Sequence, residues 1–371
     1  MSDAPSRGER QYYLISADSH VNEPPDLWTS RVPAAFTDRV PRMERFDEGD
    51  AWIVEGIDGP MPFGLNAGAG LPRHKREPWL FWEEVRPGGY DPAARICEMD
   101  EDLVDGEVLF PTPRLFSAVV ATPDTELHLN MVRAYNDWVT EFAGHDPSRL
   151  RALPVVPNVG VDHALAEIER VCDRPGVGGV NIGQYPHGGV MPTEEDDPVW
   201  AVLAERGLSA NIHVALAAAM PKSSGTPGPL PGAGRHLPIG GQLLELIFSG
   251  AFDRCPGLHV VAAEVDCGWV PYFKEQIDDN FRRFRHRFDL PRLPSEYLEN
   301  HVSFTFVTDG YGIANRHHVG VERMMWSTDY PHPSASWPMS AALANGMMAD
   351  VPADERQAIL CDNARRIYRF A

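Results

Sequence analysis

The chain of 371 residues lacks several features that would each indicate a particular class of protein. Basic residues are few, 33 against 53 acidic ones, and the formal net charge is −20. A nucleic-acid partner is therefore not expected, because phosphate backbones attract positively charged surfaces. No run approaches the roughly 20 apolar residues that cross a bilayer, and the polar N-terminus carries no export signal. We expect a cytoplasmic protein that makes no membrane contact.

Cysteine and lysine are also scarce. The five cysteines are scattered, odd in number and free of any Cys-x-x-Cys pair, which argues against a disulfide framework or a thiolate zinc site. Lysine occurs only at Lys75, Lys222 and Lys274, none of them on an expected strand, so a catalytic strand lysine is not expected. The glycine-rich dinucleotide fingerprint is missing after every expected strand.

What the sequence does contain is a regular alternation of short apolar runs and amphipathic segments. Eight strands are predicted, at 12–18, 106–111, 150–157, 177–183, 208–214, 258–265, 301–306 and 323–329. Helices are predicted at 93–104, 126–144, 161–172, 196–206, 240–253, 271–287 and 353–370. This alternation predicts parallel α/β architecture, and eight units favour a closed (β/α)₈ TIM-like barrel over an open sheet.

Two insertions interrupt the alternation, and residues 1–371 are otherwise interpreted as a single domain. Residues 22–92 follow the first strand and include a predicted small hairpin at 51–56. Residues 215–239 follow the fifth strand and are rich in Ala, Pro, Gly and Ser, which predicts a lid loop. Both insertions follow strands, on the side where barrel enzymes keep their active sites.

Residues able to bind metal stand at the downstream ends of three predicted strands. Asp18 and His20 end the first strand, His213 the fifth and Asp329 the eighth. Residues at alternate positions leave a strand on the same side, and a closed barrel brings its first and last strands together. The mixed nitrogen and oxygen set suits one divalent zinc, manganese or iron ion that activates a bound water.

Further residues are assigned to the same site. Asp329 is the predicted proton acceptor and donor, and Glu264, at the end of the sixth strand, is predicted to be catalytic. Glu23, Glu264 and His332 could hold a second metal or support the first. Arg114 and Trp28 are predicted to contact a small-molecule substrate.

The segments that carry these residues resemble the metal-dependent amidohydrolase superfamily. Within it, the chain is similar to amidohydrolase family 2, the group related to aminocarboxymuconate-semialdehyde decarboxylase. The matching segments include Ala17-Asp-Ser-His20 and Ser327-Thr-Asp-Tyr-Pro-His332, and the others are 212–213, 264–272 and 363–368. The resemblance implies a (β/α)₈ barrel, a divalent metal held by Asp18, His20, His213 and Asp329, and assembly into a dimer or tetramer.

The resemblance leaves several reactions open. Hydrolysis by a metal-bound water is the leading expectation. Non-oxidative decarboxylation is the first alternative, but the related decarboxylases carry a histidine on the sixth strand, where this chain has Val260-Val-Ala-Ala-Glu264. A dinuclear iron or manganese–iron oxygenase would need Glu23 and Glu264 to bridge two ions. A non-catalytic partner subunit is the last alternative.

Overall fold

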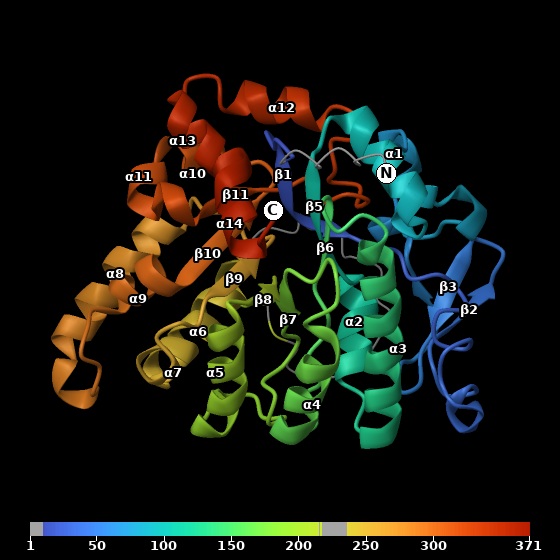
Figure 1. The fold of residues 1–371 in the computed structure, drawn as a ribbon, viewed down its shortest axis with the longest axis horizontal. Coiled ribbons are helices and arrows are strands. Elements are labelled where there is room, and N and C mark those ends of the chain that lie inside the picture. Colours follow the sequence, from blue (N-terminus) through green and yellow to red (C-terminus); the bar gives the residue numbers. More distant parts are fainter. Residues whose placement is uncertain (1–9, 215, 217–235) are drawn as a thin grey trace, which may run out of the picture.

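Eight parallel strands form the centre of the molecule. The computed structural model describes residues 10–214, 216 and 236–371. One three-stranded sheet has the order β1-β5-β6, and one five-stranded sheet has the order β11-β10-β9-β8-β7. The strands are β1 (Ile15–His20), β5 (Gly106–Phe110), β6 (Leu150–Ala152), β7 (Gly179–Asn181), β8 (Ser209–His213), β9 (Val260–Ala263), β10 (Val302–Phe306) and β11 (Met324–Trp326). All eight predicted strands are therefore present (Figure 1).

The two sheets join at both edges, so the barrel is closed. Parallel bridges Ala152↔Val177 and Val155↔Asn181 connect β6 to β7. At the other edge the Asp329 amide donates to the Asp18 carbonyl at 3.0 Å, and the His20 amide donates to the Tyr330 carbonyl at 2.6 Å. The closure between the first and last strands thus uses the main chain of three predicted metal ligands.

A β-bulge in β1 decides which of its side chains face the barrel interior. Ser16 pairs with Glu107, but the next pairing joins Ser19 to Leu109, so β1 carries one extra residue. Ile15 and Ala17 belong to an interior apolar cluster, whereas Asp18 reaches His213 on the non-adjacent strand β8. Because of the bulge, Asp18 faces the barrel interior although the preceding residue, Ala17, also does. A strand is predicted at 12–18, but β1 begins at Ile15 and ends at His20.

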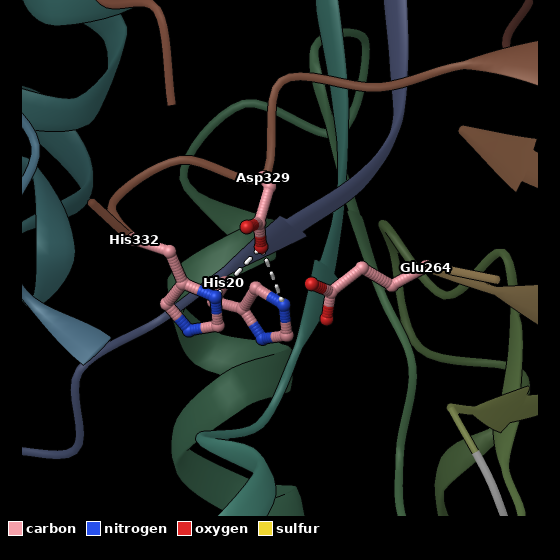
Figure 2. Close-up of side chains that lie close together, drawn as sticks. All are labelled: His20, Glu264, Asp329 and His332. Carbon is pink, nitrogen blue, oxygen red and sulfur yellow. Dashed lines mark ion pairs between the residues drawn. The ribbon is translucent and has the colours of Figure 1, made fainter. Parts of the chain in front are cut away.

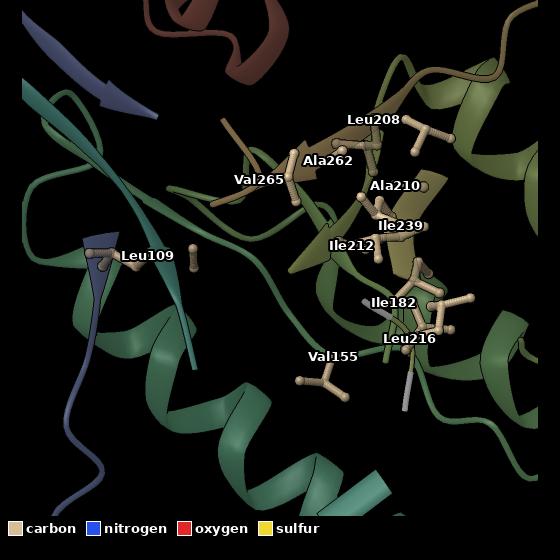
Figure 3. Packing of buried hydrophobic residues seen from close by; sticks show 14 of the residues in the cluster. Leu109, Val155, Ile182, Leu208, Ala210, Ile212, Leu216, Ile239, Ala262 and Val265 are labelled. Carbon is tan, nitrogen blue, oxygen red and sulfur yellow. The ribbon is translucent and has the colours of Figure 1, made fainter. Parts of the chain in front are cut away.

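Helices surround the barrel on its outer face. They are α1 (Pro92–Asp102), α2 (Pro113–Val120), α3 (Thr125–Gly144), α4 (Val161–Val171), α5 (Asp197–Arg206), α6 (His236–Phe248), α7 (Ala251–Arg254), α8 (Val270–Arg283), α9 (Pro294–His301), α10 (Gly310–Ala314), α11 (Arg316–Val319) and α12 (Ser340–Met347). Alternation along β8 turns Ala210 and Ile212 outward, where Figure 3 shows them close to Ile239 of α6. Asn211 and His213 consequently face inward.

The C-terminal segment covers the upstream end of the barrel. The helix predicted at 353–370 is broken into α13 (Ala353–Gln357), a π-helical turn (Ala358–Asp362) and α14 (Asn363–Tyr368). Tyr368 is fully buried and packs with Ile15 in the interior cluster, and its hydroxyl donates to Asn211 Oδ1 at 2.9 Å. A buried apolar cluster that includes Tyr368, Ile15 and Phe370 therefore fills this end of the barrel.

The insertions differ from expectation in detail. Residues 22–92 hold a three-stranded antiparallel sheet of β2 (Arg42–Arg45), β3 (Asp50–Ile53) and β4 (Met61–Pro62), so the predicted hairpin is one strand short. Most of the predicted lid at 215–239 lies outside the described residues, and its last residues, from His236, begin α6. The assignment of 1–371 to one domain stays a prediction.

Arg95 of α1 ties the insertion to the barrel. It is fully buried, and its Nε lies 2.5 Å from Glu107 Oε2 on β5. Its Nη1 donates to the carbonyl oxygens of His20, at 3.0 Å, and Gly88, at 2.9 Å. Its guanidinium also lies over the ring of Tyr330, 4.5 Å from the ring centre. One side chain therefore contacts both segments that meet where β1 closes against the segment after β11.

We expect Arg95→Met to lower the free energy of unfolding by about 3–5 kcal/mol, because it leaves the carboxylate of Glu107 buried without its cation. Urea denaturation followed by circular dichroism measures the loss. The double variant Arg95→Met/Glu107→Leu is the control and should recover much of it, because it removes both charges. A loss below about 1 kcal/mol in the single variant would contradict this role for Arg95.

Candidate metal centre

The four residues predicted to bind metal meet at the downstream end of the barrel. Nε2 of His20 lies 3.5 Å from Asp18 Oδ1 and 3.3 Å from Asp329 Oδ1. Nε2 of His213 lies 3.1 Å from Nε2 of His20 and 3.7 Å from Asp18 Oδ1. Three of these side chains are fully or almost fully buried, and that of His213 is 7 % exposed. Donor atoms separated by more than 300 residues in sequence thus face a common point.

Two further predicted residues join this group. Nδ1 of His332 lies 2.7 Å from Asp329 Oδ1, and the His332 ring stacks on the ring of His20 with centroids 4.0 Å apart. Glu264 Oε2 lies 3.4 Å from His213 Nε2. Figure 2 shows Asp329 and His332 on one side of His20, with Glu264 approaching from the other. Within the described residues, two overlapping groups could hold a metal: Asp18, His20 and His213, and His20, Glu264, Asp329 and His332.

The hydrogen bond at the far side of His20 fixes which ring nitrogen can bind a cation. Nδ1 of His20 lies 3.0 Å from the carbonyl oxygen of Pro111. A carbonyl only accepts, so we assign the ring proton to Nδ1. The neutral ring then directs the lone pair of Nε2 toward the carboxylates of Asp18 and Asp329 and toward His213. Metal-binding histidines are oriented in this way by a carbonyl or carboxylate behind the ring.

The electrostatics of the cluster agree with a site for positive charge. Burial by itself lowers the pKa of His20, but the hydrogen bond to Asp329 and the charge of Asp18 outweigh it, and the pKa is raised. Burial raises the pKa of Asp329, but the charge of His332 and the hydrogen bonds from both histidines hold it well below its usual value. Both shifts have the same origin, because buried carboxylates favour positive charge at the point where the imidazoles and carboxylates meet.

Backbone strain is concentrated at the strand ends that present these residues. Glu264 has φ of 56°, Asp329 has φ of 55°, and Val214, directly after His213, has φ of 60°. A β-branched residue such as valine rarely adopts this left-handed conformation, and such strain gathers at functional sites. The strain turns the chain sharply where each strand leaves the barrel, which directs neighbouring side chains toward its axis.

Three polar residues that support the cluster were not predicted. The Thr305 hydroxyl on β10 donates to Asp18 Oδ2 at 3.3 Å and accepts from the Glu264 amide at 2.7 Å. The Ser334 hydroxyl donates to Asp329 Oδ2, and Asn66 Nδ2 lies 3.2 Å from His332 Nε2. Alternation of Ser303 and Thr305 with phenylalanines along β10 would have revealed Thr305. Nothing local marks Asn66, which reaches the site from the insertion.

Glu23 lies beside the cluster but outside both metal-capable groups. Its Oε1 accepts from the Thr112 amide at 3.0 Å, and burial raises its pKa against the opposing effect of that hydrogen bond. It lines a narrow apolar cavity together with Trp28 and Tyr135. A role for Glu23 in a second metal site stays a prediction.

The two residues predicted to contact substrate occupy different settings. Trp28 is 2 % exposed, donates from Nε1 to the Met131 carbonyl at 3.1 Å, and packs edge-to-face on Trp52. These contacts fasten the insertion to α3. Arg114 is half-buried near the start of α2, and burial lowers its pKa. Substrate binding by either residue stays a prediction.

Comparison with known proteins agrees with this geometry. The family model described as amidohydrolase matches residues 17–370, which include seven barrel strands, β1 from Ala17 onward, and every residue of both metal-capable groups. The chain belongs to the amidohydrolase family. The resemblance and the TIM-barrel fold expected from the sequence are thereby confirmed, and this amidohydrolase-family chain is an enzyme of the hydrolase or carboxy-lyase type.

Individual relatives are more distant. The chain is 25% identical to 2-amino-3-carboxymuconate-6-semialdehyde decarboxylase of Dictyostelium discoideum over 271 residues, 68% of this chain and 70% of the relative. A crystal structure of an amidohydrolase from Mycobacterium avium subsp. paratuberculosis matches with a TM-score of 0.73 at 21% identity, covering 97% of this chain and 100% of that one. A dihydroxybenzoic acid decarboxylase from a Polaromonas species, with bound manganese and the inhibitor 2-nitroresorcinol, matches with a TM-score of 0.64 at 16% identity, covering 97% of each chain.

Among the described residues, no helix combines the length and the apolar character needed to cross a membrane.

Proposed function

We propose that this amidohydrolase-family chain is a metal-dependent carboxy-lyase, which removes carbon dioxide from a small organic acid without oxidation. The convergence of Asp18, His20, His213 and Asp329 at the open end of the barrel carries the proposal. The decarboxylases among the relatives favour this reaction over hydrolysis, the leading expectation from the sequence. Aromatic and muconate-type acids are the proposed substrate class.

The donor set fits one divalent ion. Asp18, His20, His213 and Asp329 would hold it, and imidazole with carboxylate ligands suits manganese, zinc or iron. Both metal-capable groups share His20, and its Nδ1 already faces the Pro111 carbonyl. Only Nε2 is then available, which supports one ion and argues against the dinuclear oxygenase. When bound, the ion would polarise the oxygen atoms of the substrate and lower the pKa of a coordinated water.

The chain's own residues would supply the proton that decarboxylation requires. The carbon–carbon bond breaks, carbon dioxide leaves, and a proton takes its place on the carbon. Asp329 Oδ1 faces Nδ1 of His332 at 2.7 Å, so the pair can hold and pass a proton between these atoms. Ser334 and Asn66 hold the outer atoms of the pair. The sixth-strand histidine of related decarboxylases is absent here, and His332 places an imidazole near the same centre from the loop after β11.

Metal analysis and carbon dioxide release test the proposal together. We expect purified protein to hold about one divalent ion per chain, and manganese-loaded protein to release labelled carbon dioxide from carboxyl-labelled dihydroxybenzoate or aminocarboxymuconate-type acids. Chelation should reduce release to background, and added manganese should restore it. Mass spectrometry measures both the metal content and the gas.

Other outcomes would select a different function. Cleavage of amides or esters without carbon dioxide release would return hydrolysis to first place. Two ions per chain and oxygen consumption would favour the oxygenase, and the lack of any metal after gentle purification would favour a non-catalytic subunit. Assembly into a dimer or tetramer and a cytoplasmic location stay predictions, as do the catalytic role of Glu264 and the small-molecule contacts of Arg114 and Trp28.

A further inference from the structure

A small cavity opens beside His213, on the side of β7. It is narrow, and its walls include Pro111, Pro113, Phe116, Gly183 and Asn181. Most of this surface is apolar. The cavity adjoins a residue of the candidate metal centre, so a molecule bound at the centre could extend one end into it.

Asn181 is the buried polar side chain that faces this cavity. It ends β7 and is 1 % exposed, and the adjacent Ile182 packs with the outer apolar cluster visible in Figure 3. Because neighbouring residues of a strand alternate, the carboxamide of Asn181 points toward the barrel interior. Neither its Nδ2 nor its Oδ1 has a hydrogen-bond partner among the described residues.

The neighbouring strand carries an asparagine that behaves differently. Asn211 of β8 pairs in register with Asn181, and its carboxamide is fully engaged. Its Nδ2 donates to the Val180 carbonyl at 2.9 Å, and its Oδ1 accepts from the Tyr368 hydroxyl at 2.9 Å. Hydrogen bonds within the protein therefore explain why an asparagine is buried at position 211. Asn181 keeps two buried polar atoms unmatched within the described chain, which costs folding free energy unless a ligand uses them.

We propose that Asn181 is a specificity-determining residue that hydrogen bonds a hydroxyl group on the ring of the substrate. The proposal rests on the proposed function, and it adds which group of the substrate Asn181 would recognise. A carboxamide offers one acceptor and two donor hydrogens, which matches a hydroxyl that both donates and accepts. A carboxylate only accepts and would leave Oδ1 unmatched. The apolar walls formed by Pro111, Pro113 and Phe116 suit a flat ring.

Gly183 sets the width of this subsite. A Cβ atom at Gly183 would lie 2.6 Å from Cε1 and 2.8 Å from Cζ of Phe116. Any larger residue would therefore push the Phe116 ring out of its place in the cavity wall. The absence of a side chain at Gly183 therefore allows the Phe116 ring to keep its place in the wall that it shares with Asn181.

Paired ligands test the proposal. Isothermal titration of manganese-loaded protein would compare 2-, 3- and 4-hydroxybenzoate, each with the fluorobenzoate substituted at the same position. We expect wild-type protein to prefer the hydroxyl compound about tenfold or more in at least one pair. In Asn181→Leu, and in the smaller Asn181→Ala, this ratio should fall to within about twofold, because the carboxamide is gone.

Thermal stability supplies a second readout that separates binding from support of the fold. Asn181→Leu should leave the Tm of the ligand-free protein unchanged or raise it, because it removes unmatched polar atoms. The control Asn211→Leu should lower the Tm, because it breaks satisfied hydrogen bonds. Three results would each overturn the proposal. The hydroxyl preference could persist in both Asn181 variants, or the wild-type protein could show no preference in any pair. Asn181→Leu could also lower the Tm as much as Asn211→Leu does. The binding ratio does not depend on turnover, so the two failures can be told apart: failure to release carbon dioxide contradicts the proposed function, and a failed hydroxyl preference contradicts this inference about Asn181.

Discussion

Asp329→Asn is expected to lower turnover by about 10²–10⁴-fold while some of the bound metal remains. The carboxylate faces His20 and His332 through Oδ1, and an amide at this position can neither accept nor pass on the proton. The fold should survive, because asparagine tolerates the left-handed backbone that residue 329 adopts, with φ of 55°. Steady-state kinetics and elemental analysis of the same preparation measure the two effects.

Ser334→Ala serves as the matched control for this variant. Ser334 donates to the other oxygen of Asp329 and therefore orients the carboxylate without transferring the proton. We expect a smaller loss of turnover than in Asp329→Asn, with the same metal content. Unchanged turnover in Asp329→Asn would remove Asp329 from the chemistry, and complete loss of metal would assign it to metal binding alone.

The sequence predicts the barrel well because buried parallel strands are short apolar runs with a regular spacing. The residues at the ends of such runs could be named before any geometry was known, because the downstream strand ends of a closed barrel share one face. Asp18, His20, His213 and Asp329 are of this kind, and they do lie together.

Other features depend on pairing and could not be predicted in this way. The bulge in β1 arises from its register with β5, and it decides that Asp18 and His20 face inward after Ile15 and Ala17. Asn66 approaches His332 from an insertion with no periodic pattern. Neither feature leaves a local signal in the sequence. The preference for decarboxylation over hydrolysis likewise comes from the relatives, since one centre supports both reactions.

The structure also connects barrel closure with the chemistry. The main chains of Asp18 and His20 hydrogen bond the segment that carries Asp329 and Tyr330. Any loosening of this edge would separate the ligands on the first strand from those on the last. The buried guanidinium of Arg95 contacts the same edge, so its loss should weaken metal binding as well as stability.

His213→Ala is expected to remove the bound metal and reduce turnover to background while the barrel stays folded. His213 is the proposed ligand contributed by β8, opposite the strands that close the barrel, so Asp18, His20 and Asp329 would then approach the ion from one side only. Loss of a residue that merely orients a ligand typically costs 10–100-fold in metal affinity, and loss of the ligand itself should cost more. Elemental analysis after dialysis measures the metal, and circular dichroism reports the fold.

Addition of free imidazole to His213→Ala provides the most specific check, because it replaces the lost donor without restoring the side chain. Metal content and turnover should recover in part, since the deleted ring leaves space between Phe110 and His20. The exposed His163 of α4 supplies the control, because His163→Ala changes the same residue type far from the barrel axis and should keep full metal content. Full metal content in His213→Ala would exclude His213 from the ligand set and leave the ion to β1 and the loop after β11.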